Sequence, residues 1–182
     1  MKTEKLDIEG LVLITPKRHG DARGWFCESW SRESYKKNGI DADFIQDNMS
    51  LSVPRHTVRG LHFQIAPFAQ AKLVSVPQGR ILDVAVDIRP GSATYGRHVA
   101  IELSAENGQQ LYIPAGFAHG FCTLAENTLV SYKINAPYAP AHERGILWHD
   151  PDLKISWPVS PKSAIVSEKD CQYPQFKDFK NA

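Results

Sequence analysis

The sequence predicts an all-β protein built as an antiparallel sandwich or barrel, with few and short helices. Three observations support this fold class. Short segments with apolar residues at alternate positions recur through the chain, as strands with one buried face require. Turn sequences rich in Gly and Pro, of which the 182 residues contain twelve each, separate these segments at fairly regular spacing. Segments with the longer period of an amphipathic helix are few, which disfavours a βαβ arrangement.

Length and composition predict a single domain over residues 1–182, long enough to bury a sizeable core. The net charge of +1 and the absence of long runs of like charge argue against a nucleic-acid scaffold or a membrane-surface binder. The three cysteines, Cys27, Cys122 and Cys171, have no C-x-x-C spacing and are expected to be reduced thiols. The sequence contains no recognisable signal peptide or membrane span, so we expect a cytoplasmic protein.

The first elements are a strand at residues 11–14 and a turn-rich loop at residues 19–24. An aromatic segment with Glu28 inside it follows the loop. For Arg23, Phe26 and Glu28, an edge strand with a solvated ion pair is an equal alternative to a binding role.

Residues 31–38 form the best helix candidate of the first half, because Ser31 can cap the start and Gly39 can end it. The alternation of polar and apolar residues over residues 44–48 predicts a strand in which Gln46 and Asn48 share one face. That face lines a cavity or meets water, and the alternation does not distinguish the two.

Residues 57–64 predict a strand whose period places two sets of residues on opposite faces: Arg59, Leu61 and Phe63 on one, Gly60, His62 and Gln64 on the other. A histidine on a face that points into a cavity is a candidate acid or base, the alternative being a surface or satisfied core histidine. Lys72 favours the functional interpretation, because it lies at the start of an apolar strand, where burying an ammonium is costly unless its charge is used.

The second half of the chain is densely β. Strands are predicted at residues 73–76, 80–88, 99–103, 111–113 and 129–134. Residues 160–182 are expected to form a tail, with a turn or a short helix, that packs across the barrel.

Pro114, Gly116 and His119 have the P-x-G-x-x-H spacing of the second conserved motif of cupins, the jelly-roll barrels. In a metal-binding cupin the partner motif supplies two histidines and a following glutamate, because a divalent metal needs converging imidazole and carboxylate ligands. Here Gln64 stands in place of the second histidine, and Lys72 would oppose a bound cation. We therefore expect a cupin barrel without a metal site. A structural loop histidine is the alternative for His119.

Further motifs run through the chain: Asp21-x-Arg-Gly-x-Phe26, Gln46-Asp-Asn48, Val58-Arg-Gly-Leu-His-Phe-Gln64, Gln70-x-Lys-Leu73, Gly79-x-Ile-x-Asp83-Val, Asp87-Ile-Arg89, Pro114-x-Gly-x-x-His119-Gly, Tyr132-Lys133 and Ile146-x-Trp-x-Asp-Pro151. In this order and spacing they resemble the dTDP-4-dehydrorhamnose 3,5-epimerases, and the resemblance spans essentially residues 8–170. The R-G-L-H-[FY]-Q and Q-x-K-L pair is highly specific.

The resemblance implies a homodimeric cupin barrel that acts, without metal or cofactor, on a dTDP-4-keto-6-deoxy sugar in activated-rhamnose synthesis for surface polysaccharide. It also implies that His62 is the base, Asp170 its orienting partner, Lys72 the enolate stabiliser and Tyr132 the acid on the opposite face. Ten further positions match the substrate-contact pattern: Arg23, Phe26, Glu28, Gln46, Asn48, Arg59, His119, Tyr138, Glu143 and Lys169. His19 stands where many family members have Phe on the nucleotide-contacting loop, which leaves the residues around the thymine ring open.

Two alternatives belong to different classes of protein. The first is a relative that inverts one carbon only, or that acts on a related dTDP-4-keto sugar; the complete set of His62, Lys72, Tyr132 and Asp170 favours the double epimerase. The second is a sugar-binding or storage module of cupin fold without turnover. Such a module would need no reactive base.

Overall fold

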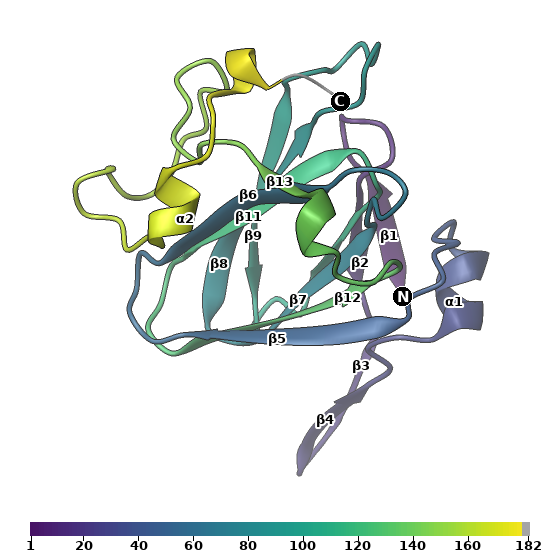
Figure 1. Cartoon of the computed structure of the whole chain (residues 1–182). Coiled ribbons are helices and arrows are strands. Elements are labelled where there is room, and N and C mark those ends of the chain that lie inside the picture. Colours follow the sequence, from purple (N-terminus) through teal and green to yellow (C-terminus); the bar gives the residue numbers. More distant parts are fainter. Residues whose placement is uncertain (180–182) are drawn as a thin grey trace.

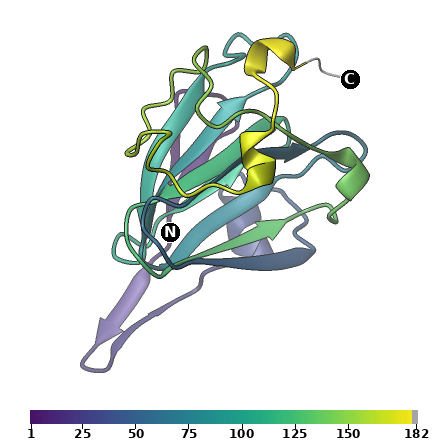
Figure 2. The ribbon, with the colours of Figure 1, turned by 60° about the vertical axis from the view of Figure 1, so that its left-hand side comes forward.

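A computed structural model describes residues 1–179, and the protein consists of two antiparallel β-sheets packed face to face with short helices at their periphery (Figure 1). Figure 2 shows the same two layers from a second direction. This arrangement confirms the predicted all-β barrel with few short helices. Among residues 1–179, no helix combines the length and the apolar composition needed to cross a bilayer.

The strands of the two sheets come from interleaved parts of the chain. The larger sheet has the spatial order β1 (Lys2–Lys5), β2 (Val12–Thr15), β10 (Gln110–Ile113), β7 (Lys72–Gln78), β12 (Thr128–Ile134) and β5 (Gln46–Ser52). The smaller sheet has the order β13 (Glu143–Gly145), β6 (Val58–Gln64), β11 (Phe117–Thr123), β8 (Arg80–Asp87) and β9 (His98–Ser104). Most neighbouring strands are therefore far apart in sequence, so the sheets gather residues from the whole chain into the space between them.

The main core lies between the sheets and consists of alternate apolar residues from both. Val74 and Val76 of β7 and Val130 of β12 meet Ala85 of β8 and Phe121 of β11 in one buried cluster. Burial of this kind contributes roughly 25 cal/mol for each Å² of apolar surface removed from water. The cluster holds the two walls of the barrel together.

Helix α1 (Arg32–Lys37) begins where the sequence predicts, with the Ser31 hydroxyl accepting a hydrogen bond from the Ser34 N–H. The other helical turns are η1 (Pro140–His142), α2 (Glu168–Cys171) and η2 (Phe176–Asp178). Phe176 and Phe179 pack on the outer, apolar face of the smaller sheet, so the segment after residue 160 crosses that sheet as far as it is described. Residues 180–182 of the predicted tail lie outside the described residues.

The predicted loop at residues 19–24 is wrong, because this segment pairs with itself as β3 (Arg18–Asp21) and β4 (Gly24–Cys27). The Asp21 carboxylate accepts a hydrogen bond from the Arg23 N–H at 2.8 Å, which closes the turn and brings the two strands together. The hairpin forms its own two-stranded sheet and projects from the barrel (Figure 1).

Besides β3 and β4, the strands β1, β11 and β13 were not predicted, and the bounds of β5 differ from those expected. β11 was not predicted because its sequence, FAHGFCT, follows Pro114 and Gly116 and does not alternate; every residue in it is buried. β13 has three residues, which are too few to show a periodic pattern. β5 extends to Ser52, beyond the predicted end at residue 48, because its inward-facing residues are polar and do not show the pattern of a strand with a buried apolar face.

The predicted faces of β6 are wrong at Arg59, which lies on the same side as His62. The pairing of β6 with β11 shifts by one residue between His62, opposite His119, and Arg59, opposite Phe121. This β-bulge adds a residue around Gly60 and restarts the alternation. Gly60 has φ of +134°, and a Cβ there would lie 2.5 Å from the Gly120 Cα, so only glycine allows the close approach.

Candidate active site

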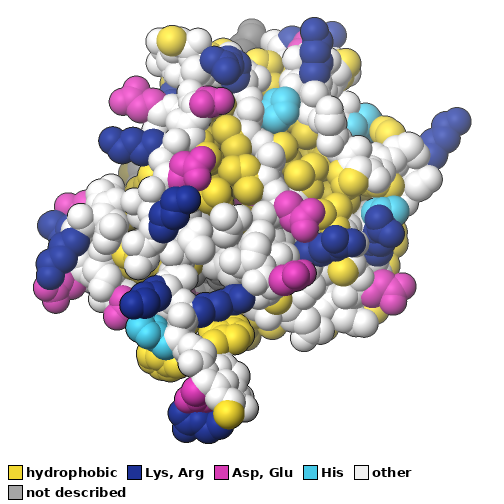
Figure 3. Space-filling view, turned by 180° about the vertical axis from the view of Figure 1, so that it is seen from behind, with side chains coloured by type: hydrophobic (Ala, Val, Ile, Leu, Met, Phe, Trp, Pro, Cys, Tyr) yellow, Lys and Arg dark blue, Asp and Glu magenta, His cyan; other side chains and the backbone are white. Residues whose placement is uncertain are grey.

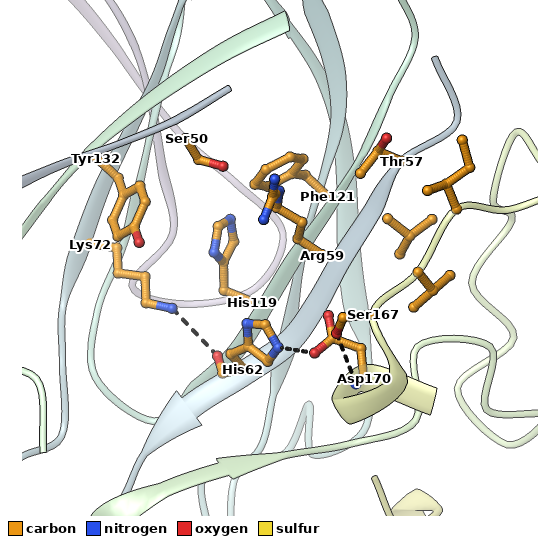
Figure 4. A pocket seen from close by; sticks show the side chains of 13 residues that line it. Ser50, Thr57, Arg59, His62, Lys72, His119, Phe121, Tyr132, Ser167 and Asp170 are labelled. Atoms are coloured by element: carbon orange, nitrogen blue, oxygen red, sulfur yellow. Dashed lines mark hydrogen bonds and ion pairs between the residues drawn. The ribbon is translucent and has the colours of Figure 1, made fainter. Parts of the chain in front are cut away.

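Between the two sheets lies a cavity of about 480 Å³ whose walls carry polar side chains from β6, β7, β11, β12 and α2 (Figure 4). A smaller cavity of about 150 Å³ adjoins it, and His62, Lys72 and Tyr132 line both. An elongated ligand could therefore occupy both cavities, with its middle at these three side chains.

His62 points into the cavity because its neighbours Leu61 and Phe63 belong to the apolar cluster on the other face of the sheet. Its Nε2 lies 2.8 Å from Asp170 Oδ1, and about a third of its side chain is exposed. A carboxylate at this distance fixes the orientation of the ring. His62 therefore points into the cavity with its imidazole held by Asp170.

Asp170 is buried in α2 and is held at both oxygens. Its Oδ2 accepts a hydrogen bond from the Gly60 N–H at 3.0 Å, and the Ser167 hydroxyl caps the helix by accepting from the Asp170 N–H. Burial alone would raise the pKa of Asp170, but the hydrogen bonds from His62 and Gly60 hold it below its usual value. The carboxylate therefore stays ionised behind the imidazole.

Lys72 enters the cavity from β7, in the opposite sheet, and is 8% exposed. Its Nζ reaches the His62 carbonyl oxygen only at 3.4 Å, so this ammonium is weakly bonded among the described residues. Burial lowers the pKa of Lys72 to about 8, while Asp83 and Glu143 act in the opposite direction. Near neutral pH it remains a cation that can meet a developing negative charge.

Tyr132 lies on β12, next to β7, so it faces His62 from the other wall of the cavity (Figure 4). Desolvation raises the pKa of its phenol, with Arg59 opposing and Glu143 adding to the shift. A neutral phenol is a proton donor. The cavity thus receives an imidazole from one sheet and a phenol from the other.

A second imidazole–carboxylate pair lines the same cavity. His119 Nε2 lies 2.8 Å from Asp83 Oδ1, and both residues are buried. Burial lowers the pKa of His119; Asp83 opposes this effect, and Lys72 and His62 add to it. A neutral His119 that donates from Nε2 to Asp83 keeps Nδ1 as a hydrogen-bond acceptor.

The structure brings most of the predicted binding residues to the two cavities. Arg59 and His119 line the larger one, and Gln46, Asn48, Tyr138 and Glu143 line the smaller one. Glu143 accepts hydrogen bonds from the Tyr138 hydroxyl at 2.7 Å and from the Lys169 ammonium at 2.5 Å. Lys169 thereby ties α2 to β13 beside the smaller cavity.

Arg23, Phe26 and Glu28 line neither cavity of their own chain. They lie on or next to the projecting hairpin, where Arg23 forms an exposed ion pair with Asp21 and Phe26 is 72% exposed. Figure 3 shows this projection with hydrophobic and charged side chains next to one another.

Gln64 does not offer its side chain to a metal. Its amide donates to the Phe68 and Pro137 carbonyl oxygens and accepts from the Ala139 N–H, so all of its groups hold neighbouring loops. Among residues 1–179, no three His, Cys, Asp or Glu side chains gather as a metal site would require.

Sequence reasoning gave no role to Asp83 or Tyr173, although both lie beside the predicted residues. Asp83 could have been found as a lone acid inside an apolar strand, because an unpaired carboxylate there is costly. Tyr173, whose ring lies against that of His62, follows α2 and has no pattern that marks it.

Comparison with known proteins places these residues in context. The family model described as dTDP-4-dehydrorhamnose 3,5-epimerase matches residues 5–178. A protein of that name from Sinorhizobium fredii is 51% identical over 174 residues, 96% of this chain and 89% of the relative.

Two solved structures are similar over nearly their full length. One is the dTDP-4-dehydrorhamnose 3,5-epimerase of Bacillus anthracis with TDP and PPi bound, at TM-score 0.93 and 44% identity, covering 96% of this chain and 98% of that one. The other is the dTDP-6-deoxy-D-glucose-3,5-epimerase of Legionella pneumophila in complex with dTDP-4-keto-L-rhamnose, at TM-score 0.93 and 41% identity, covering 98% and 94%.

Proposed function

Because the chain belongs to the dTDP-4-dehydrorhamnose 3,5-epimerase family and is an isomerase of that activity, we propose that its two cavities bind the dTDP-4-keto-6-deoxy sugar and that four residues invert carbons 3 and 5. These residues are His62, Lys72, Tyr132 and Asp170. The observation that carries the proposal is that a paired imidazole, a buried ammonium and a phenol meet where the two cavities join.

The substrate's chemistry calls for these groups. Carbons 3 and 5 flank the C4 ketone, so removal of either proton gives an enolate whose charge falls on O4. A fixed cation in a dry cavity stabilises that charge without reorganising its surroundings. Lys72, buried and weakly bonded, is the residue for this role.

Inversion needs a proton to leave one face of the carbon and another to arrive on the opposite face. His62 takes the first proton, supported by Asp170, and Tyr132 delivers the second from the other sheet. General acid–base catalysis of this kind contributes roughly a hundredfold to ten-thousandfold in rate.

The nucleotide part of the substrate is assigned to the smaller cavity and its rim, where Gln46, Asn48, Tyr138, Glu143 and Lys169 gather. The relatives from Bacillus anthracis and Legionella pneumophila, which contain TDP and a dTDP-linked sugar, support a ligand of this class. Arg59 lines the larger cavity, where its forked donors suit an oxyanion of the substrate.

The functional unit is proposed to be a homodimer, and the projecting hairpin supports this. A two-stranded hairpin is at best marginally stable alone, yet this one exposes Trp25 (59%) and Phe26 (72%). The barrel in turn has an open edge strand, β5, with Met49 and Leu51 exposed. A second copy that covers these side chains would bring Arg23, Phe26 and Glu28 to its partner's cavity.

Catalysis is proposed to need no metal, because Gln64 is fully used in holding loops. The three cysteines are free thiols, which supports the proposed cytoplasmic location.

The direct test is incubation with dTDP-4-keto-6-deoxyglucose in deuterated water, with carbons 3 and 5 followed by NMR. Deuterium at both carbons with inverted product, unchanged by a chelator, is the expected result. Deuterium at one carbon only would show a single-centre epimerase, and no exchange at either carbon would show a binding module. His62→Asn should lower turnover by roughly a hundredfold or more while the affinity for dTDP stays near normal.

A further inference from the structure

We propose that Tyr173 is a positioning residue that holds the His62 imidazole in place through its ring and not through its hydroxyl. The inference rests on the proposed role of His62 as the base. It concerns what keeps that base in its reactive orientation.

The place that Tyr173 fills is set by the pairing of β13 with β6. Gly145 is directly opposite His62, and side chains of such a pair lie next to each other on the same face of the sheet. Gly145 has no side chain, so one flank of the imidazole would be empty. Aromatic rings are known to cover a strand glycine in this way.

The Tyr173 ring occupies that flank. A Cβ built on Gly145 would overlap three carbons of the ring, so the ring lies directly on the glycine. Its centroid is 5.6 Å from that of His62, with the two planes at 69°, an edge-to-face arrangement. His62 is thus held by Asp170 at Nε2 and by Tyr173 on the flank next to β13.

The backbone around Tyr173 is anchored, which keeps the ring in place. The Leu147 N–H donates to the Pro174 carbonyl oxygen at 2.9 Å, and three residues earlier Asp170 bonds to Gly60. One short segment therefore presents both the carboxylate and the ring to the same imidazole.

The hydroxyl of Tyr173 is buried and makes no hydrogen bond of standard geometry within residues 1–179, although it lies close enough to the Lys169 ammonium to interact with it. Lys169 keeps its hydrogen bond to Glu143 without this hydroxyl, so Phe should replace Tyr at little cost. Leu would fill less of the flank and let the imidazole turn.

The experiment measures kcat and KM for Tyr173→Leu, Tyr173→Phe and Tyr95→Leu. Misplacing a catalytic group by about 1 Å can cost a hundredfold, so Tyr173→Leu should lower kcat by roughly tenfold to a hundredfold, with KM changed less than about threefold. Tyr173→Phe should keep at least about half of the wild-type kcat. Tyr95 packs on Phe176, which belongs to the same C-terminal segment as Tyr173, and it lines neither cavity, so Tyr95→Leu is the matched control for losing a ring that contacts this segment.

Gly145→Ala tests the same idea without touching Tyr173, because the added methyl must displace the ring. It should lower kcat about as much as Tyr173→Leu, and the double variant should lose less than the product of the two separate losses, since both changes act on one contact. Thermal unfolding of each variant, measured in parallel, shows that the folded chain is being assayed.

The inference is overturned if Tyr173→Leu keeps the wild-type kcat, if Tyr173→Phe loses as much as Tyr173→Leu, or if the losses of the double variant simply multiply. A failure of the proposed function would appear in other measurements, namely the deuterium-exchange assay of the wild-type chain and the turnover of His62→Asn. The two failures are therefore distinguishable.

Discussion

The buried ammonium of Lys72 lowers the stability of the fold, and its proposed role in stabilising the enolate explains why this residue is present. Burial lowers its pKa to about 8 in the folded protein, against an ordinary value near 10.5, so below pH 8 the fold holds a charge that it disfavours. The penalty disappears as the pH rises from about 8 towards the unfolded value. Stability and the proposed catalysis therefore make opposite demands on this side chain.

Lys72→Met should thus abolish most turnover and yet raise the free energy of unfolding at pH 7, by about 1 to 3 kcal/mol. Denaturant unfolding and the NMR assay measure the two effects. In the wild-type chain kcat should fall as the pH rises above about 8, because the ammonium loses its proton. A variant with normal turnover, or a wild-type rate that climbs steadily to pH 10, would remove Lys72 from the proposed mechanism.

Tyr132→Phe should separate proton exchange from inversion. With the phenol gone, His62 can still remove the substrate proton and Lys72 can still stabilise the enolate, but the proton must return from the face it left. In deuterated water the variant should incorporate deuterium with retained configuration, and inverted product should fall by more than exchange does. Equal losses of both would mean that Tyr132 serves the first proton transfer or binds the substrate.

At the scale of the elements, the bulge in β6 decides what the strand presents. It turns Arg59 and His62 to the same cavity while Leu61 and Phe63 stay on the apolar side. Without the extra residue at Gly60, regular alternation would turn one of the two polar side chains away from the cavity.

Gly60→Ala should therefore cost about 2 kcal/mol or more of stability, from a left-handed φ and from overlap with the Gly120 backbone, and should greatly reduce turnover. Gly91→Ala is the matched control, since Gly91 has φ of +76° but open space around its Cβ. It should cost about 1 kcal/mol and leave turnover normal. If both variants behaved alike in denaturant and in the assay, the close contact of Gly60 with Gly120 would have no importance of its own.

Sequence reasoning could predict those elements whose local pattern matches their environment. The strand at residues 80–88 and the helix capped by Ser31 were correct because alternation and capping are local properties. The bulge in β6 and the buried strand β11 could not be predicted, because both depend on which strand lies alongside.

The same limit applies to the site. The family motifs identified His62, Lys72, Tyr132 and Asp170, and all four line one cavity, although their proposed roles stay predictions. Asp83 and Tyr173 were missed because each matters only through a contact with a residue far away in the sequence, His119 or His62.

At the scale of the whole molecule, the proposed homodimer predicts complementation between two inactive variants. One chain carries His62→Asn, and the other carries Arg23→Ala with Phe26→Ala. In a mixed dimer, the cavity of the second chain has His62 and receives the intact hairpin of the first. Random mixing should restore up to about a quarter of the wild-type activity, since half of the dimers are mixed and each has one complete site.

Mixing His62→Asn with Lys72→Met is the control, because both residues lie in the cavity and no complete site can form. Recovery in the first mixture alone would support exchange of hairpins. If neither mixture recovered while the chains still formed mixed dimers, the hairpin would have to serve its own cavity or none.

His62 lies in one wall of the barrel, and Lys72 and Tyr132 lie in the other. The apolar side chains between the walls, such as Val76 and Ala85, are therefore spacers that set the gap in which the substrate is proposed to react. A core substitution that moves the two sheets closer together or farther apart by a fraction of an ångström would change the width of this gap and therefore the reaction rate. Tuning of reaction speed in this protein is thus open to residues that never touch the sugar.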